Sequence, residues 1–166
     1  MNFGPMTEQL ADLDSHRIEG FTREGGHKFS VPLFTQIAEN LWMGGCPKPE
    51  GAPQFNTIIC LYPWENYKVY PGQVHTRVFM LDGQDVPSNE LLAQLIGAIV
   101  LGVETGPTLV HCQAGLNRSG LVTAAYLIAM ERKSPAKAIA LLREKRCDAV
   151  LCNKAFEAYL MSLGGE

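Results

Sequence analysis

The 166-residue sequence lacks long apolar runs, a marked excess of either charge, and any ordered spacing of metal-binding side chains. No apolar stretch reaches the roughly 18 residues that a membrane-spanning helix needs. The N-terminus has neither a basic stretch nor an apolar core, so we expect no secretory leader. Together these absences predict a soluble, cytoplasmic protein without a membrane among its partners.

Charge and histidine spacing argue against two further classes. The net charge of −3 and the pI near 5.8 leave no broad basic surface, so nucleic acid is not expected as a partner. The histidines show no ligand spacing with one another or with the cysteines, so we expect no metal and no cofactor. These four histidines are His16, His27, His75 and His111.

Five cysteines form an odd set without the spacing of a disulfide framework. Such a set is typical of free thiols in a reducing compartment. A hydrophobic content of 46% is enough for one domain with a full core. The pattern does not indicate an oligomeric state.

Strand-like and helix-like segments alternate along the chain, which predicts a single α/β domain. We expect a central, mostly parallel, twisted sheet flanked by helices. Short apolar, β-branched runs predict strands at Thr57–Tyr62, Val78–Leu81 and Thr108–Cys112. Helical spacing and capping residues predict helices after Ser88, from Arg118 to Met130, after Ser134 and after Asn153.

From residue 110 to residue 120 the chain reads Val-His-Cys-Gln-Ala-Gly-Leu-Asn-Arg-Ser-Gly, between a predicted strand and a predicted helix. Backbone N–H groups at such a junction bind anions, and the helix N-terminus favours the thiolate of Cys112. The planar guanidinium of Arg118 can bind two phosphate oxygens. Gly115 suits a loop that needs positive φ. The pattern predicts a phosphate-binding loop whose variable positions are Gln113, Ala114, Leu116 and Asn117.

The run His-Cys-x5-Arg-Ser resembles the signature of the cysteine-dependent protein tyrosine phosphatase superfamily, and the chain is most similar to its small dual-specificity branch. The resemblance covers about residues 30–162, and Ile37–Gly45 resembles the opening strand of that branch. It implies a catalytic domain over 30–166 that hydrolyses phosphotyrosine, and also phosphoserine or phosphothreonine, in proteins through a cysteinyl-phosphate. Residues 1–29 are then an N-terminal extension, with a short helix around Thr7–Leu13 or disorder.

Expelling an alkoxide or a phenolate from phosphorus calls for a proton donor. The resemblance implies an aspartate on a loop upstream of Cys112. Asp82 lies 30 residues before Cys112 and matches the family position better than Asp85, which lies 27 residues before it. Asp85 stays a rival, and Asp82 is also typical of a tight Asp-Gly turn. By resemblance, Ser119 donates to the Cys112 sulfur and helps the thiolate to leave.

Two residues near the nucleophile are expected to act indirectly. Neighbouring strand residues face opposite sides, so His111 should point away from the phosphate and order the loop, unless it is simply a buried core histidine. Cys60 ends a strand expected beside that of Cys112. In some relatives a cysteine in this region forms a reversible disulfide with the nucleophile, although a buried strand cysteine is the simpler interpretation.

The substrate is less well indicated than the chemistry. The variable positions of the loop carry no charge, whereas phosphoinositide phosphatases of the superfamily usually place lysines there. Asn117 before the arginine resembles RNA 5′-phosphatase relatives, so an RNA 5′-triphosphatase or polyphosphatase is the alternative. A phosphate-binding module without turnover is a second alternative. Residues 62–67 either wall the cleft or form a surface loop.

Overall fold

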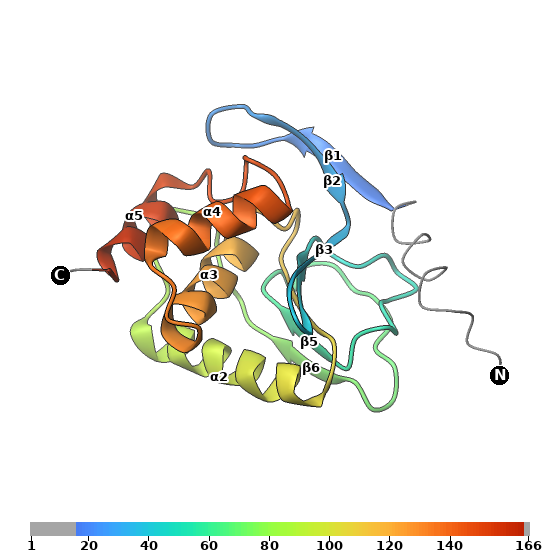
Figure 1. Ribbon diagram of the computed structural model, residues 1–166. Helices are drawn as coiled ribbons and strands as arrows, with labels where there is room; N and C mark the ends of the chain where they lie inside the picture. Colours follow the sequence, from blue (N-terminus) through green and yellow to red (C-terminus); the bar gives the residue numbers. More distant parts are fainter. Residues whose placement is uncertain (1–15, 165–166) are drawn as a thin grey trace.

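The computed structural model describes residues 16–164 (Figure 1). The helix expected around Thr7–Leu13 therefore lies outside the described residues. The elements, in chain order, are β1 (Arg17–Phe21), β2 (Lys28–Pro32), β3 (Phe34–Ala38), β4 (Leu41–Gly44), β5 (Thr57–Cys60), β6 (Val74–Arg77), α2 (Asn89–Thr105), β7 (Thr108–His111), α3 (Arg118–Met130), α4 (Pro135–Lys145) and α5 (Lys154–Ser162).

Five strands form the central sheet in the order β3-β4-β7-β5-β6. Strands β4, β7, β5 and β6 run parallel, and β3 pairs antiparallel with β4. The predicted α/β class and mostly parallel sheet are confirmed. Strand β7 lies in the middle with all four residues buried, so the loop that follows it is supported by a strand on each side.

Helices α2 to α5 gather on one side of the sheet, with α3 packed among the other three (Figure 1). The first ten residues of α3, from Arg118 to Leu127, are all buried. The opposite face of the sheet carries Ile58 and Leu109, which pack against Phe34 and Phe55. The predicted caps are confirmed for three helices, because the side chains of Ser88, Ser134 and Asn153 accept hydrogen bonds from the first-turn N–H groups.

The strand predicted at Val78–Leu81 is wrong in position, since β6 ends at Arg77. The ladder between β5 and β6 closes where the N–H of Val78 donates to the carbonyl of Cys60. β5 ends at Cys60, so the residues that follow Val78 have no neighbouring strand to pair with. Met80 turns into the core instead, and Asp82 comes from an irregular segment rather than directly from a strand.

The described part of the N-terminal extension is a β-hairpin, neither helix nor disorder. Strand β1 pairs antiparallel with β2. Ile18 packs against the cluster of Phe34 and Phe55 on the face of the sheet opposite to the helices. The hairpin reaches across toward α4 and α5 (Figure 1), where the carboxylate of Glu24 accepts a hydrogen bond from the N–H of Lys154 at 3.1 Å. Its alternation is weak and it carries three glycines, which is why the sequence pattern did not reveal it.

Arg146, just after α4, joins the loop after β7 to the first strands. Its guanidinium donates to the carbonyls of Gly115 (2.8 Å) and Ala114 (3.0 Å). It also donates to the carbonyl of Pro32 and the hydroxyl of Thr35, each at 2.8 Å. Burial lowers the pKa of Arg146 to about 10, so the side chain stays charged at neutral pH. A buried charged donor with four acceptors is a strong local constraint.

Replacing Arg146 with methionine should lower the free energy of unfolding by about 3 kcal/mol, because three buried or partly buried carbonyls lose their donor. Chemical denaturation measures this change. Lys145→Met is the matched control, since Lys145 is exposed at the end of the same helix, and it should stay within about 0.5 kcal/mol of the parent. Equal losses in the two variants would contradict the role assigned to Arg146.

Candidate active site

Cys112 lies at the carboxyl end of β7, at the base of the loop, with only 2% of its surface exposed. Its Sγ is 3.3 Å from the hydroxyl of Ser119, as predicted for a donor to the thiolate. Burial by itself would raise the pKa of the Cys112 thiol. The charge of Arg118 and hydrogen bonds from Ser119 and the N–H of Leu116 outweigh burial, so the pKa is lowered. The site therefore favours a buried thiolate.

Four successive carbonyls of the loop accept hydrogen bonds from the surrounding scaffold. Two of them, from Ala114 and Gly115, are those bound by Arg146. The carbonyl of Gln113 accepts from the N–H of Cys46 at 3.0 Å, and that of Leu116 from the N–H of Leu151 at 3.1 Å. With its carbonyls held outside, the loop presents N–H groups to its interior, which is the arrangement of an anion-binding nest.

Both the backbone conformation and the space around it require a glycine at position 115. Its φ of 73° is the positive value that the sequence predicted. A Cβ here would also lie 2.4 Å from the backbone of Gly44, so the loop rests directly on the end of β4.

Arg118 opens α3 and is almost fully buried, with 7% of its surface exposed. One Nη donates to the carbonyl of Met80 at 3.3 Å. Among the residues that the structure describes, its buried Nε has no hydrogen-bond partner. Buried donors are rarely left unpaired, so this N–H is available to an anionic ligand in the loop. The predicted pairing of a thiolate and a phosphate-binding guanidinium is thus brought together in one place.

Aromatic side chains stand beside Arg118. Its guanidinium lies 5.1 Å from the ring of Tyr62 and 6.0 Å from that of Trp64. The rings of Tyr62 and Trp64 are 4.9 Å apart, and the same distance separates Trp64 from Phe79. Trp64 and Phe79 are 48% and 63% exposed. We call Tyr62, Trp64 and Phe79 the aromatic rim; it marks the side of the loop where an aromatic ligand finds an open apolar surface.

His111 lies on the face of the sheet opposite to Cys112, as alternation along β7 predicts. Its Nδ1 donates to the carbonyl of Cys112 at 3.0 Å, so the histidine braces the loop. Its Nε2 is 2.7 Å from the hydroxyl of Tyr67, which is also 2.8 Å from Nε2 of His75. Burial lowers the pKa of His111 to about 4, so the ring is neutral at pH 7. Nε2 then accepts from Tyr67, whose oxygen accepts from His75. The sequence did not predict this chain of hydrogen bonds from His75 through Tyr67 to His111.

Cys60 pairs in register with His111, so its side chain lies on that same face, away from Cys112. Burial raises the pKa of the Cys60 thiol, which makes it less reactive. All five cysteines are free thiols. This placement does not favour a redox disulfide between Cys60 and Cys112, which stays an untested prediction.

Asp82 reaches the loop and Asp85 is exposed to solvent. One carboxylate oxygen of Asp82 accepts a hydrogen bond from the side-chain amide of Asn117 at 3.0 Å, and the other from that of Asn153 at 2.7 Å. Sequence reasoning placed Asn117 among the phosphate-binding positions and Asn153 only at a helix start. No local pattern reveals their meeting, because the three residues come from three distant segments.

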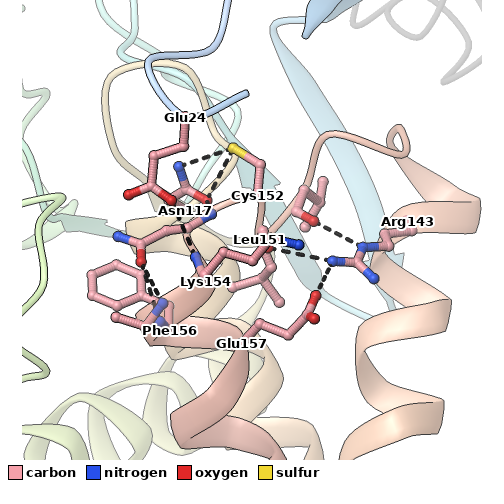
Figure 2. A network of polar contacts seen from close by, with 11 residues as sticks. Glu24, Asn117, Arg143, Leu151, Cys152, Lys154, Phe156 and Glu157 are labelled. Atoms are coloured by element: carbon pink, nitrogen blue, oxygen red, sulfur yellow. Dashed lines mark hydrogen bonds and ion pairs between the residues drawn. The ribbon is translucent and has the colours of Figure 1, made fainter. Parts of the chain in front are cut away.

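Part of this network is visible in Figure 2, where Asn117 contacts Cys152 near the start of α5, with Glu24 of the hairpin close by. A cavity of about 580 Å³ lies between the hairpin tip and the α4–α5 connection, and Cys152 is one of its walls. Arg143 closes another side, bonded to Glu157 and to backbone carbonyls. Within residues 16–164, no group of three or more potential ligands is placed to hold a metal ion.

The lowered pKa of Cys112 predicts that iodoacetamide alkylates this thiol with a pH midpoint below the ordinary thiol value of 9.0. Mass spectrometry of peptides from a pH series measures the midpoint. Ser119→Ala should move it upward, because the thiolate loses a donor. Cys46 is the internal control, since burial and the nearby Glu65 raise its pKa to about 12. An unchanged midpoint in Ser119→Ala would contradict the role of that hydroxyl.

Buried, neutral His111 should make the protein less stable in acid. Between about pH 6.5 and about pH 4 the unfolded chain binds a proton that the folded chain does not. The free energy of unfolding should therefore fall on acidification, with a slope of up to about 1.4 kcal/mol per pH unit from this residue. Denaturation at several pH values should show a shallower slope for His111→Gln than for the parent, and an equal slope would contradict the contribution assigned to His111.

Comparison with known proteins agrees with this geometry. Residues 59–165 match the family model described as dual specificity phosphatase, catalytic domain. The chain is similar to protein tyrosine phosphatase domain-containing protein 1 of Bos taurus, with 29% identity over 84 residues, or 47% of this chain and 11% of that protein. It is also similar to the tyrosine-protein phosphatase CDC14 homolog of Schizosaccharomyces pombe, with 27% identity over 158 residues, or 82% of this chain and 29% of that protein.

The fold is similar to the crystal structure of human DUSP28, with a TM-score of 0.66 and 19% identity, over 78% of this chain and 96% of that one. The chain spans less than a third of the length of the bovine and fission yeast relatives. Among the described residues, no helix is long and apolar enough to cross a membrane. The match of the family model to most of the sequence, including the loop of Cys112, shows that the chain belongs to the family of dual-specificity phosphatase catalytic domains.

Proposed function

We propose that this chain hydrolyses phosphomonoesters of tyrosine in proteins, and also of serine or threonine, through a cysteinyl-phosphate intermediate. One observation carries the proposal. The thiol of Cys112, with its pKa lowered, lies in a loop whose carbonyls are held outside. Beside it is Arg118, whose buried Nε has no hydrogen-bond partner within residues 16–164. A dianionic phosphate is the ligand that such a nest and guanidinium suit.

In the first step the thiolate of Cys112 attacks phosphorus, an S–P bond forms, and the bond from phosphorus to the ester oxygen breaks. The loop N–H groups and Arg118 stabilise the charge that builds on the other phosphate oxygens. Asp82 gives its proton to the leaving oxygen. Asp82 is favoured over Asp85 by its contact with a loop residue, Asn117.

In the second step the Asp82 carboxylate takes a proton from water, and the water oxygen attacks phosphorus. The S–P bond breaks, inorganic phosphate leaves, and the thiolate is restored. The hydroxyl of Ser119, 3.3 Å from the sulfur, supports this step by donating to the departing thiolate.

The aromatic rim supports phosphotyrosine as the preferred ester. Its exposed rings stand next to the guanidinium that would hold the phosphate. Aromatic pairs contribute about 0.5–1.5 kcal/mol beyond the burial of their area, which a serine or threonine ester cannot obtain. The uncharged side chains at positions 113–117 leave no cations for a second phosphate, which favours a singly phosphorylated side chain.

RNA with a 5′-triphosphate is the second candidate, because the same rim could stack a base. The residue that suggested it, Asn117, is engaged by Asp82, Cys152 and Asn153. These contacts account for an asparagine at position 117 without any contact to a polyphosphate, and so favour a protein substrate.

The purified chain should release phosphate from a phosphotyrosyl peptide faster than from the phosphoseryl version of that peptide or from triphosphorylated RNA. Malachite green detection of phosphate measures all three rates. Cys112→Ser should abolish the activity, because it removes the nucleophile, and chelators should leave the parent rate unchanged. Lys145→Met serves as the unaffected control. Chelator-sensitive activity that survives in Cys112→Ser would overturn the mechanism, and a faster RNA reaction would overturn the choice of substrate.

A further inference from the structure

The carboxylate of Asp82 is held by two asparagine amides that come from different segments of the chain. The Nδ2 of Asn117 donates to one oxygen, and the Nδ2 of Asn153 donates to the other oxygen and to the carbonyl of Gly83 at 2.9 Å. Asn117 directly precedes Arg118 in the phosphate-binding loop. A contact to Asp82 from this position ties the segment of the proton donor to the loop that holds the phosphate.

Each amide is itself fixed, so neither is a freely rotating surface group. Oδ1 of Asn117 accepts from the N–H of Asn153 at 2.9 Å, and its Nδ2 also lies 3.4 Å from the sulfur of Cys152 (Figure 2). Oδ1 of Asn153 accepts from the first-turn N–H groups of α5, on Ala155 and Phe156. The carboxylate is therefore oriented by side chains whose own rotamers are locked.

Asp82 needs such support because the segment from residue 78 to residue 88 has no regular secondary structure. Proton transfer requires the donor within hydrogen-bond reach of the leaving oxygen, and small displacements reduce the rate strongly. Asn117 has a side chain near the start of α3 but makes no capping hydrogen bond there. Its polar atoms are directed to Asp82, Cys152 and Asn153 instead.

We propose that Asn117, together with Asn153, is a positioning residue that orients the Asp82 carboxylate for proton transfer to the leaving group. The proposal rests on the function proposed above and deepens it. Asn117 acts through Asp82, so its removal should matter in proportion to how much the leaving oxygen needs a proton. A purely structural asparagine would affect all substrates alike.

The test compares 4-nitrophenyl phosphate, whose leaving group departs readily as an anion, with phenyl phosphate, whose leaving group needs a proton. Asn117→Ala should lower kcat/KM, which reports the step in which the leaving group departs, by about 30-fold for phenyl phosphate, within the range of general acid catalysis, and by less than about threefold for 4-nitrophenyl phosphate. Asp82→Asn should show the same selectivity with a larger loss. Asn56→Ala is the matched control and should match the parent. The side-chain amide of Asn56 donates to the carbonyl of Thr105 just before β5, at the end of the parallel strands opposite to the loop of Cys112.

Two further variants separate positioning from folding. In a variant carrying both Asp82→Asn and Asn117→Ala, kcat/KM for phenyl phosphate should equal that of Asp82→Asn alone, because Asn117 has no acid left to orient. Asn153→Ser keeps a good N-cap for α5 but is too short to reach Asp82. It should reproduce the selective loss of Asn117→Ala with a melting temperature close to the parent value.

A loss that is equal for both esters, or that adds to the loss of Asp82→Asn, would overturn the proposal while leaving the phosphatase function intact. Failure of the proposed function is a separate result, namely activity that persists in Cys112→Ser. If Asn117→Ala does not fold, the comparison of Asn153→Ser with the parent on the two esters decides the question.

Discussion

The guanidinium of Arg146 holds the shape of the loop on which the chemistry depends. A loop that turns its N–H groups toward one anion must dispose of its carbonyls elsewhere, and water cannot reach all of them in a packed domain. Arg146 takes two of these carbonyls and ties them to Pro32 and Thr35 at the start of the sheet. A residue outside the loop thus helps to orient the backbone N–H groups of the site.

Other residues outside the reacting groups also support the site through hydrogen bonds. His111 turns away from the site and its Nδ1 donates to the carbonyl of Cys112, which fixes the tautomer of the ring, while Tyr67 donates to Nε2. Asn117 and Asn153 orient Asp82 in a comparable way. The reacting groups are few and each is supported by a polar side chain from a distant segment, so the site is pre-organised by tertiary packing rather than by the local loop sequence.

The sequence predicts the parts of the molecule that depend on local patterns. The mostly parallel sheet, the capped helices at Ser88, Ser134 and Asn153, and the positive φ of Gly115 follow from periodicity and from the demands of single residues. The meeting of Cys112, Ser119 and Arg118 follows from one short motif. The family model matches residues 59–165, a range that includes this motif.

The remaining features depend on contacts that no local pattern encodes. Strand β6 was expected at Val78–Leu81, because that run is more apolar than the true strand at Val74–Arg77, and pairing with β5 decided the position. The β1–β2 hairpin gains its order from Ile18 packing on the main domain. Arg146 appears in sequence as one more cation near a helix end, and its role emerges only when β2, β3 and the loop assemble around it.

One strand supplies both the reacting atom and the brace behind it. Successive side chains along β7 and the residue after it point to opposite faces of the sheet. Cys112 therefore faces the site while His111 faces the other side and contacts Tyr67. A slip of one residue in the pairing of β7 with β4 and β5 would exchange the two faces, burying the thiol under the sheet and placing an imidazole in the loop. Strand register therefore decides which side chain enters the loop, and under the proposed function substitutions far from the loop should lower activity if they loosen that register.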